Sequence, residues 1–151
     1  MQGHQNMRRI LIMGAKGVGK RTLSNLIEGE QTTNKNNLDL YYRKKTIIAP
    51  GEFLEQTWLN NALIMVSQNQ AYINLFLINS LDNSYYPPAF ANSFTKRNIG
   101  VITKIDLMDE KNYKKSYQMA EDLGLDQIVA ISNKTQDGLE KLIEIIKEAE
   151  A

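Results

Sequence analysis

A glycine-rich segment with a lysine near its end, GAKGVGKRT (residues 14–22), carries the clearest chemistry in the chain. Gly14, Gly19 and Lys20 match the spacing Gly-x4-Gly-Lys, in which glycines let backbone N–H groups approach phosphates and the lysine ammonium reaches their outer oxygens. An apolar run precedes this segment and a helical pattern follows it, which is the context that the motif requires. The sequence therefore predicts a phosphate-binding loop rather than a glycine-rich turn with a solvated lysine.

The residue after the lysine departs from this pattern. Arg21 stands where the motif places a serine or threonine whose hydroxyl binds Mg²⁺, and a guanidinium, which is always cationic, cannot ligate a metal ion. Thr22 is turned by about 100° around a helix and should point away from the metal position. Two roles for Arg21 stay open: its charge could act on the phosphates in place of the metal, or its side chain could face solvent.

A second polar set lies at the end of an apolar strand pattern, in residues 103–106 (TKID). The carboxylate of Asp106 could accept hydrogen bonds from N1–H and the 2-amino group of guanine, whereas adenine would face it with a lone pair. Because a helical stretch follows, Asp106 could instead be a helix N-cap. The small polar residues 132–134 (SNK) follow the last predicted strand, and they could close over a base or form an ordinary turn.

The overall composition argues against several classes of protein. Basic and acidic residues nearly cancel, 18 against 17, so we expect no nucleic-acid partner. Without cysteine there are no disulfides or thiolate zinc sites, and the one histidine, His4, precedes the predicted fold. The apolar runs are too short to span a membrane. We therefore expect a cytoplasmic protein with no membrane span.

Strand and helix patterns alternate along the chain, which predicts an α/β fold with a mostly parallel sheet and helices on both faces. We expect strands at residues 8–13, 38–42, 46–49, 73–78, 98–102 and 127–131. We expect helices at residues 19–28, 53–66, 89–94 and 137–147, and a polar helix that ends at Gly124. The phosphate-binding segment and the two polar sets each follow a predicted strand, so the carboxyl edge of the sheet should gather them.

The chain length of 151 residues and a hydrophobic content of 42% suit one core. We expect a single domain at residues 7–151. Residues 1–6 are polar and unpatterned, and we expect a disordered tail or a non-native addition there.

In order and spacing these motifs resemble the Ras-like GTPases and, more narrowly, the EutP/PduV family of small P-loop proteins. The segment APGEF (residues 49–53) stands in place of the family's D-T-P-G-E-Y, YPPAF (residues 86–90) stands in place of F-P-P-G-F, and VITKIDL (residues 101–107) also fits. The resemblance runs from Met7 over nearly the whole chain. It implies a Ras-like P-loop NTPase fold, a three-layer sandwich around a six-stranded sheet with one antiparallel edge strand.

The resemblance also implies a ligand and a setting. The ligand would be a purine nucleotide, GTP or GDP in preference to ATP, with Gly51 near the γ-phosphate. The family is linked with ethanolamine and propanediol utilisation and with bacterial microcompartments, whose shell or enzymes would be the partners. We expect the nucleotide to be bound by Gly14, Lys16, Gly17, Val18, Gly19, Lys20, Arg21, Thr22, Gly51, Thr103, Lys104, Asp106, Ser132, Asn133 and Lys134.

The resemblance implies that three positions contribute to a magnesium site. In this chain those positions hold residues that differ from the expected ligands, namely Arg21, Asn37 and Ile48. Since hard cations need oxygen ligands, we expect no protein-held metal, and Mg²⁺ only through the nucleotide. Lys20 and Glu52 are the candidates for a catalytic role. Glu52 stands where the Ras-like pattern has a glutamine that orients water, so hydrolysis should be slow or absent.

Three functions stay open from the residues and the resemblance together. The first is a nucleotide-binding protein with little hydrolysis, and the second is an interaction module whose nucleotide site is vestigial. The third is an acetate-kinase-like phosphotransferase, although no residues in the sequence suggest an acceptor site for a carboxylate. The segment YYPP (residues 85–88) could likewise bind a partner or stiffen its loop.

Overall fold

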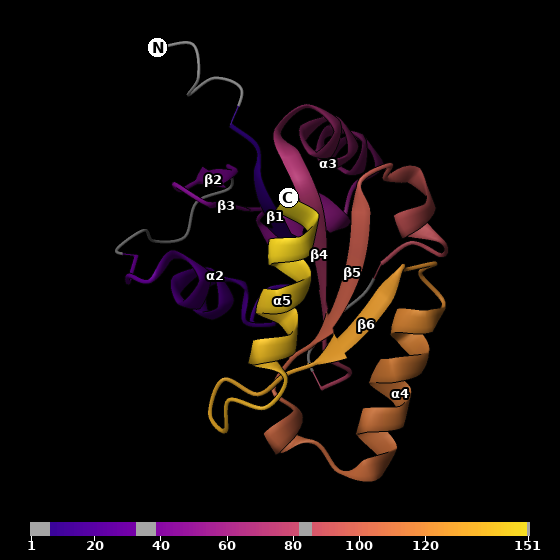
Figure 1. Cartoon of the computed structure of the whole chain (residues 1–151). Coiled ribbons are helices and arrows are strands. Elements are labelled where there is room, and N and C mark those ends of the chain that lie inside the picture. The colour runs from indigo at the N-terminus through magenta and orange to yellow at the C-terminus, as the bar shows by residue number, and fades with distance from the viewer. Residues whose placement is uncertain (1–6, 33–38, 82–85, 151) are drawn as a thin grey trace.

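The computed structural model describes residues 7–32, 39–81 and 86–150 of the chain (Figure 1). Its strands are β1 (Arg9–Met13), β2 (Tyr41–Tyr42), β3 (Thr46–Ile48), β4 (Ala71–Ile78), β5 (Arg97–Ile102) and β6 (Gln127–Ala130). Its helices are α2 (Lys20–Glu28), α3 (Thr57–Gln70), α4 (Glu110–Glu121) and α5 (Leu139–Glu150), with short 3-10 helices η1 (Gly51–Leu54), η2 (Phe90–Ser93) and η3 (Ile105–Leu107). Within the described ranges, no helix is both long and apolar enough to cross a membrane.

The strands form one sheet in the order β2-β3-β1-β4-β5-β6. β2 pairs with β3 in an antiparallel manner, and each of the other described pairs is parallel. The predicted mostly parallel, six-stranded sheet with one antiparallel edge strand is therefore confirmed. Because β1 lies between β3 and β4, the segment that follows it leaves the middle of the carboxyl edge, where open α/β sheets bind their ligands.

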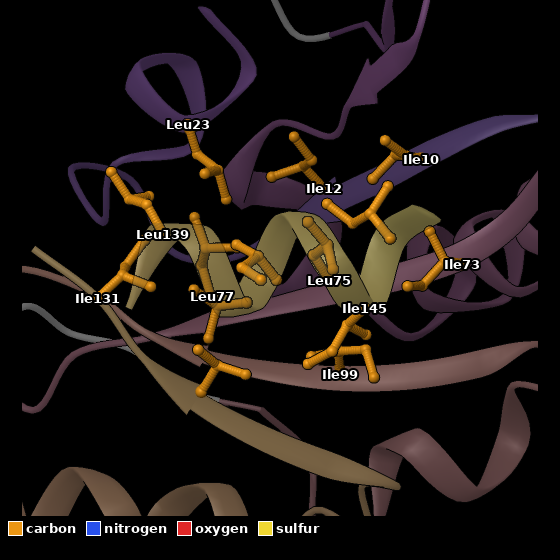
Figure 2. Packing of buried hydrophobic residues seen from close by; sticks show 14 of the residues in the cluster. Ile10, Ile12, Leu23, Ile73, Leu75, Leu77, Ile99, Ile131, Leu139 and Ile145 are labelled. Atoms are coloured by element: carbon orange, nitrogen blue, oxygen red, sulfur yellow. The ribbon is translucent and has the colours of Figure 1, made fainter. Parts of the chain in front are cut away.

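Two hydrophobic clusters cover the two faces of the sheet and produce the predicted three layers. On one face, Leu23 of α2 and Ile145 of α5 meet side chains of β1, β4 and β5. Figure 2 shows these isoleucine and leucine side chains lying between the strands and the two helices. On the other face, α3 and α4 contribute Leu63 and Ala120. Figure 1 shows α5 in front of the strands.

The central strand β4 explains why the sequence shows a continuous apolar run there instead of an alternating pattern. Phe76 and Leu77 are neighbours in β4 and belong to opposite clusters, because successive strand residues point to opposite faces. Both side chains are fully buried. Helices on both faces therefore require apolar residues at every position of such a strand.

An aromatic group packs over the sheet in the connection between β4 and β5. The ring centroids of Phe90 and Phe94 lie 6.2 and 5.3 Å from that of Phe76. The ring of Tyr86 lies 5.9 Å from the same ring, on the face that α3 and α4 share. Of the two roles considered for residues 85–88, this packing supports a stiffened loop at Tyr86, while Tyr85 lies outside the described residues.

Several element boundaries differ from the predicted ones. The helix predicted at residues 53–66 is wrong at its start, because Phe53 and Leu54 are buried in η1 and the extended Gln56 (φ −132°, ψ 135°) separates η1 from α3. The last helix starts later than residue 137, because Gln136 and Gly138 have left-handed φ values of 68° and 77°. Of the strand predicted at residues 38–42, the described part forms β2 at its end only.

Candidate functional site

The loop between β1 and α2 has the tight backbone that the glycine spacing predicts. Gly19 has a left-handed φ of 108° and immediately precedes α2. Gly14 lies so close to β4 that a Cβ there would be 3.0 Å from the carbonyl oxygen of Leu77 and 2.8 Å from Cγ1 of Val18. Glycine at both positions is therefore what lets the loop hold this conformation against the sheet.

Lys20, the first residue of α2, folds back over this loop. Its Nζ donates hydrogen bonds to the carbonyl oxygens of Gly14 (2.5 Å) and Ala15 (3.2 Å). Burial lowers the pKa of Lys20 from 10.5 to about 8, while the charge of Glu52 raises it and that of Arg21 lowers it. The folded chain thus holds a poorly solvated ammonium on the loop, and a nearby anion would stabilise its charged form.

Three other side chains predicted for the site, those of Lys16, Arg21 and Thr22, are exposed. Lys16 lies in the loop, and the other two lie in the first turn of α2. Arg21 directly follows Lys20 in the chain, and its positive charge lowers the pKa of Lys20. The first turn of α2 has no acidic residue, and a helix N-terminus carries a partial positive charge. The loop therefore lies in surroundings that favour an anion.

The 3-10 helix η1 lies directly against the loop between β1 and α2 (residues 14–19), which we call the phosphate loop. A Cβ on Gly51 would be 2.8 Å from the backbone nitrogen of Lys16 and 3.4 Å from the carbonyl carbon of Ala15. Glu52 is exposed, and its charge acts on Lys20. The fold thus brings both residues predicted in this segment beside the loop.

The turn after β5 is tied to the phosphate loop by two hydrogen bonds. The buried hydroxyl of Thr103 donates to the carbonyl oxygen of Val18 (2.8 Å). Nζ of Lys104 donates to the carbonyl oxygen of Gly17. Both residues were predicted to contact a nucleotide. The structure shows both residues bracing the loop through these bonds, and their contact with a nucleotide stays a prediction.

Asp106 lies in η3, where the loop after β6 orients its side chain. Oγ of Ser132 donates to Oδ1 of Asp106 (2.7 Å), and the backbone N–H of Thr135 donates to Oγ of Ser132 (3.1 Å). The alternative of an N-cap is wrong for Asp106, because Asp109 caps α4 by accepting from the backbone N–H of Asn112 (2.8 Å). Asp106 is exposed, so a ligand can reach the oriented carboxylate.

The loop after β6 also contains Asn133 and Lys134. Nε2 of Gln136 donates to the backbone oxygen of Asn133 (2.6 Å). Oδ1 of Asn133 is buried, and no group in the described part of the chain donates to it. Lys134 is exposed. Because an unpaired buried acceptor is costly, a donor from a ligand would stabilise this loop next to Ser132.

Of the three positions predicted to lack a metal ligand, Arg21 and Ile48 lie in the described residues. Ile48, the last residue of β3, pairs with Ile12 in β1, just before the phosphate loop. Its hydrocarbon side chain offers no oxygen to a metal ion. Asn37 lies outside the described residues. In the parts of the chain that the structure describes, no cluster of three His, Asp or Glu side chains could hold a metal ion.

Two residues that sequence reasoning did not assign to the site support its loops. The hydroxyl of Tyr86 donates to the carbonyl oxygens of Leu77 (2.8 Å) and Met13 (3.2 Å), at the ends of β4 and β1. Nδ2 of Asn79 donates to the carbonyl oxygen of Thr103 (2.7 Å). A signal for Tyr86 was present, because tyrosine stands where the F-P-P-G-F segment has phenylalanine. Nothing in the sequence distinguishes Asn79 from other polar residues that follow a strand.

Comparison with known proteins identifies relatives by sequence. The family model PduV-EutP, described as "Ethanolamine utilisation - propanediol utilisation", matches residues 7–148. The propanediol utilization protein PduV of Citrobacter freundii is 31% identical over 101 residues, 67% of each chain. The probable acetate kinase EutP of Escherichia coli (strain K12) is 30% identical over 106 residues, 68% of this chain and 66% of the relative. These alignments span about two thirds of the relatives' length.

Solved structures share the fold at lower identity. The FeoB G-domain from Methanococcus jannaschii is 17% identical with a TM-score of 0.61, covering 95% of this chain and 97% of that one. A probable GTP-binding protein, engB, is 16% identical with a TM-score of 0.64, covering 93% and 97%. Elongation factor SelB from Methanococcus maripaludis, in complex with a GTP analogue, is 20% identical with a TM-score of 0.63, covering 97% and 34%. At these identities the likeness establishes the fold alone.

Proposed function

The chain belongs to the PduV-EutP family, and from this premise we propose that it binds a purine nucleotide, GTP or GDP in preference to ATP, and hydrolyses it slowly or not at all. One observation carries the proposal: Lys20 on the phosphate loop and Asp106, held by Ser132, belong to loops that are joined directly. The joining bonds run from Thr103 and Lys104 to the phosphate loop. This is the arrangement that a nucleotide needs if its phosphates and base are to be held at once.

In this proposal the phosphates depend on protein cations. Lys20 lies on the loop, and the charge of the adjacent Arg21 acts on the pKa of Lys20. A guanidinium can form paired, charge-assisted hydrogen bonds with phosphate oxygens. Arg21 and Ile48 offer no oxygen to a metal, so any Mg²⁺ would arrive with the nucleotide and be held weakly.

The base would be selected by the carboxylate of Asp106. Guanine offers N1–H and its 2-amino group to this acceptor, whereas adenine offers a lone pair. The hydrogen bond from Ser132 orients the carboxylate before a ligand arrives, which lowers the ordering cost of binding. The unpaired Oδ1 of Asn133, in the same loop, also fits the arrival of a ligand donor.

Hydrolysis would be slow because two parts of the usual catalytic set are missing. Phosphoryl transfer relies on metal, lysine and a water-orienting group acting together. Lys20 is present, but Arg21 and Ile48 replace metal ligands and Glu52 replaces the glutamine of the Ras-like pattern. Glu52 lies close enough to act on the pKa of Lys20, so its negative charge would oppose a γ-phosphate there.

As part of the same proposal, the protein acts in the cytoplasm in ethanolamine or propanediol utilisation, with a microcompartment shell or enzyme as partner. The family description and the names of the two relatives support this setting. One relative is named a probable acetate kinase, which makes phosphotransfer to a small carboxylate the second candidate function. Acyl-phosphate formation by the purified protein would favour that candidate.

Isothermal titration calorimetry with GDP, GTP and ATP tests the main proposal. Wild-type protein should bind guanine nucleotides with a Kd below about 1 mM, equivalent to about 4 kcal/mol, with or without Mg²⁺. Lys20→Ala should weaken all three nucleotides, whereas Asp106→Ala should weaken the guanine nucleotides and leave ATP unchanged. Lys114→Ala, at an exposed position in α4, is the control and should change nothing. Absence of binding in the wild type would refute the proposal and favour an interaction module with a vestigial site.

A further inference from the structure

Helix α3 differs from α4 and α5 in having no charged residue. Its 14 residues, TWLNNALIMVSQNQ, contain no Asp, Glu, Lys or Arg. By contrast, α4 and α5 contain lysine and glutamate on successive turns. A surface helix ordinarily carries charged residues on its outer side, and a helix without them is suited to being covered.

The outer side of α3 presents two large apolar side chains. Trp58 is 67% exposed and Met65 is 61% exposed. They are about two helical turns apart and therefore point to the same side of the helix, roughly 10 Å from each other along its axis. Asn61, which is exposed, and Ala62, which is half-buried, lie between them. We call these four residues the α3 face.

The spacing of the α3 face is self-complementary under a two-fold axis. If two copies of α3 pack antiparallel and cross at Asn61 and Ala62, Trp58 of each copy meets Met65 of the other. Contacts between a thioether and an aromatic ring are favourable, and the small Ala62 lets the helices approach. The indole is already oriented, because its Nε1 donates to Oε1 of Gln56 (3.0 Å).

The charges that flank α3 are opposite in sign. Glu55 is exposed and lies just before the helix. Arg8 is held at the other end, where its Nη1 donates to the carbonyl oxygens of Gln68 (2.9 Å) and Ala71 (3.3 Å). Antiparallel packing would bring Glu55 of each copy toward Arg8 of the other, whereas parallel packing would bring like charges together. The charges of Glu55 and Arg8 therefore favour antiparallel packing, which is the arrangement that the spacing of the α3 face also favours.

We propose that the α3 face is the interface of a two-fold symmetric homodimer, in which α3 packs antiparallel against α3 of a second copy. One helix pair makes a small interface, so the dimer forms reversibly and depends on concentration. Neither Trp58 nor Met65 is part of the proposed nucleotide site. The dimer therefore forms without nucleotide. The proposal of a dimer can be tested independently of the proposed function.

Sedimentation velocity of the nucleotide-free protein at concentrations up to about 0.5 mM tests this proposal. The wild type should shift from monomer to dimer as concentration rises. Met65→Glu should remain monomeric, because it places a desolvated carboxylate against the electron-rich ring of Trp58. Tyr113→Glu adds the same charge at an exposed aromatic position of α4 and should behave as wild type. A wild type that stays monomeric overturns the proposal and leaves the α3 face to a different partner.

A charge exchange tests the antiparallel register. Trp58→Lys and Met65→Glu should each abolish the dimer when introduced alone. The double variant Trp58→Lys/Met65→Glu should dimerise again, because the register places the introduced ammonium of each copy beside the introduced carboxylate of the other. A double variant that remains monomeric overturns the proposed packing.

The absence of cysteine from the chain allows a second readout. Ala62→Cys places one thiol of each copy near the two-fold axis, so mild oxidation should produce a disulfide-linked dimer. Tyr113→Cys, on α4, should remain monomeric under the same conditions. Far-ultraviolet circular dichroism verifies that each variant is folded. Equal cross-linking of the two variants would reflect random collision and would count against the α3 face.

Discussion

At Lys20, hydrogen bonding and solvation act in opposite directions. The ammonium donates to the carbonyl oxygens of Gly14 and Ala15, yet burial lowers its pKa to about 8. Folding therefore reduces the affinity of this lysine for its proton, and a bound phosphate would restore it. Lys20, the lysine of the glycine motif, should therefore change its protonation when an anion binds to the loop.

The lowered pKa of Lys20 predicts a specific dependence of stability on pH. The lysine titrates near 10.5 when unfolded and near 8 when folded, so between these values the unfolded state binds more protons. The cost of burying the charge is fully present below about pH 8 and is relieved as pH rises. Relative to Lys20→Met, the nucleotide-free wild type should gain about 3 kcal/mol in free energy of unfolding from about pH 7 to pH 10.5. Urea unfolding across this range measures the gain, and a constant difference would contradict it.

The role of Arg21 can be decided by restoring the hydroxyl that the motif expects. Without Mg²⁺, Arg21→Thr should bind GDP about tenfold more weakly, because charge-assisted hydrogen bonds are worth about 1.5 kcal/mol or more. With Mg²⁺, the new hydroxyl should recover part of the loss. Calorimetry with and without Mg²⁺ measures both effects, and Lys141→Thr, which removes an exposed charge from α5, is the control. Unchanged affinity would mean that Arg21 faces solvent.

The hydroxyl of Tyr86 is predicted to contribute to stability at the start of the phosphate loop. Tyr86→Phe keeps the aromatic packing but removes the donor to Leu77 and Met13, so the free energy of unfolding should fall by about 1–2 kcal/mol. Tyr113→Phe, an exposed tyrosine on α4, is the matched control and should be neutral. Denaturant unfolding of both variants gives the comparison. Similar losses in the two would remove the special role of the Tyr86 hydroxyl.

Among the elements, η2 shows how a short turn covers part of the sheet. Phe90, its first residue, and Phe94, which directly follows its last residue, are buried against Phe76. The turn begins after Ala89, whose φ of 55° lies in the left-handed region that L-residues with a Cβ disfavour. The segment that this stretch resembles, F-P-P-G-F, has glycine at the same place. Ala89 thus retains a backbone conformation that glycine adopts without strain.

Replacing Ala89 by glycine should therefore stabilise the protein. The left-handed conformation costs alanine about 1 kcal/mol or more, and the greater freedom of glycine in the unfolded chain offsets part of the gain. We expect Ala89→Gly to raise the free energy of unfolding by about 0.5 kcal/mol. Ala91→Gly, at a buried position within η2, should lower it by about 1 kcal/mol. Denaturant unfolding measures both changes, and a loss at both positions would contradict the strain at Ala89.

In the whole molecule, the order of the strands assembles the candidate site. The loops after β1, β5 and β6 are far apart in sequence and meet at one edge of the sheet. Thr103 bonds to Val18 and Lys104 bonds to Gly17 across more than 80 residues. The proposed dimer uses α3, whereas α2, which carries Lys20, covers the opposite face. Nucleotide binding and self-association would thus involve helices on different faces.

Local pattern was enough to predict much of the fold. Apolar runs predict the buried strands β1, β4 and β5. α2 ends at Glu28, directly before Gly29, whose left-handed φ of 81° matches the predicted stop. These features depend on residues within one or two turns of each other, so the sequence carries them directly. The predicted start of α3 is wrong because Phe53 and Leu54 fit the helical spacing of apolar residues, whereas in the structure they belong to η1.

The sequence by itself determined the phosphate loop motif and the loss of a metal-binding hydroxyl at Arg21, because both reside in adjacent residues. Only the tertiary structure decided that Ser132 orients Asp106, that Thr103 braces the loop, and that Tyr86 supports it from the end of β4. Such contacts depend on strand order and register. Hydrophobic periodicity specifies which face of an element is buried, but it does not specify which distant element will meet it.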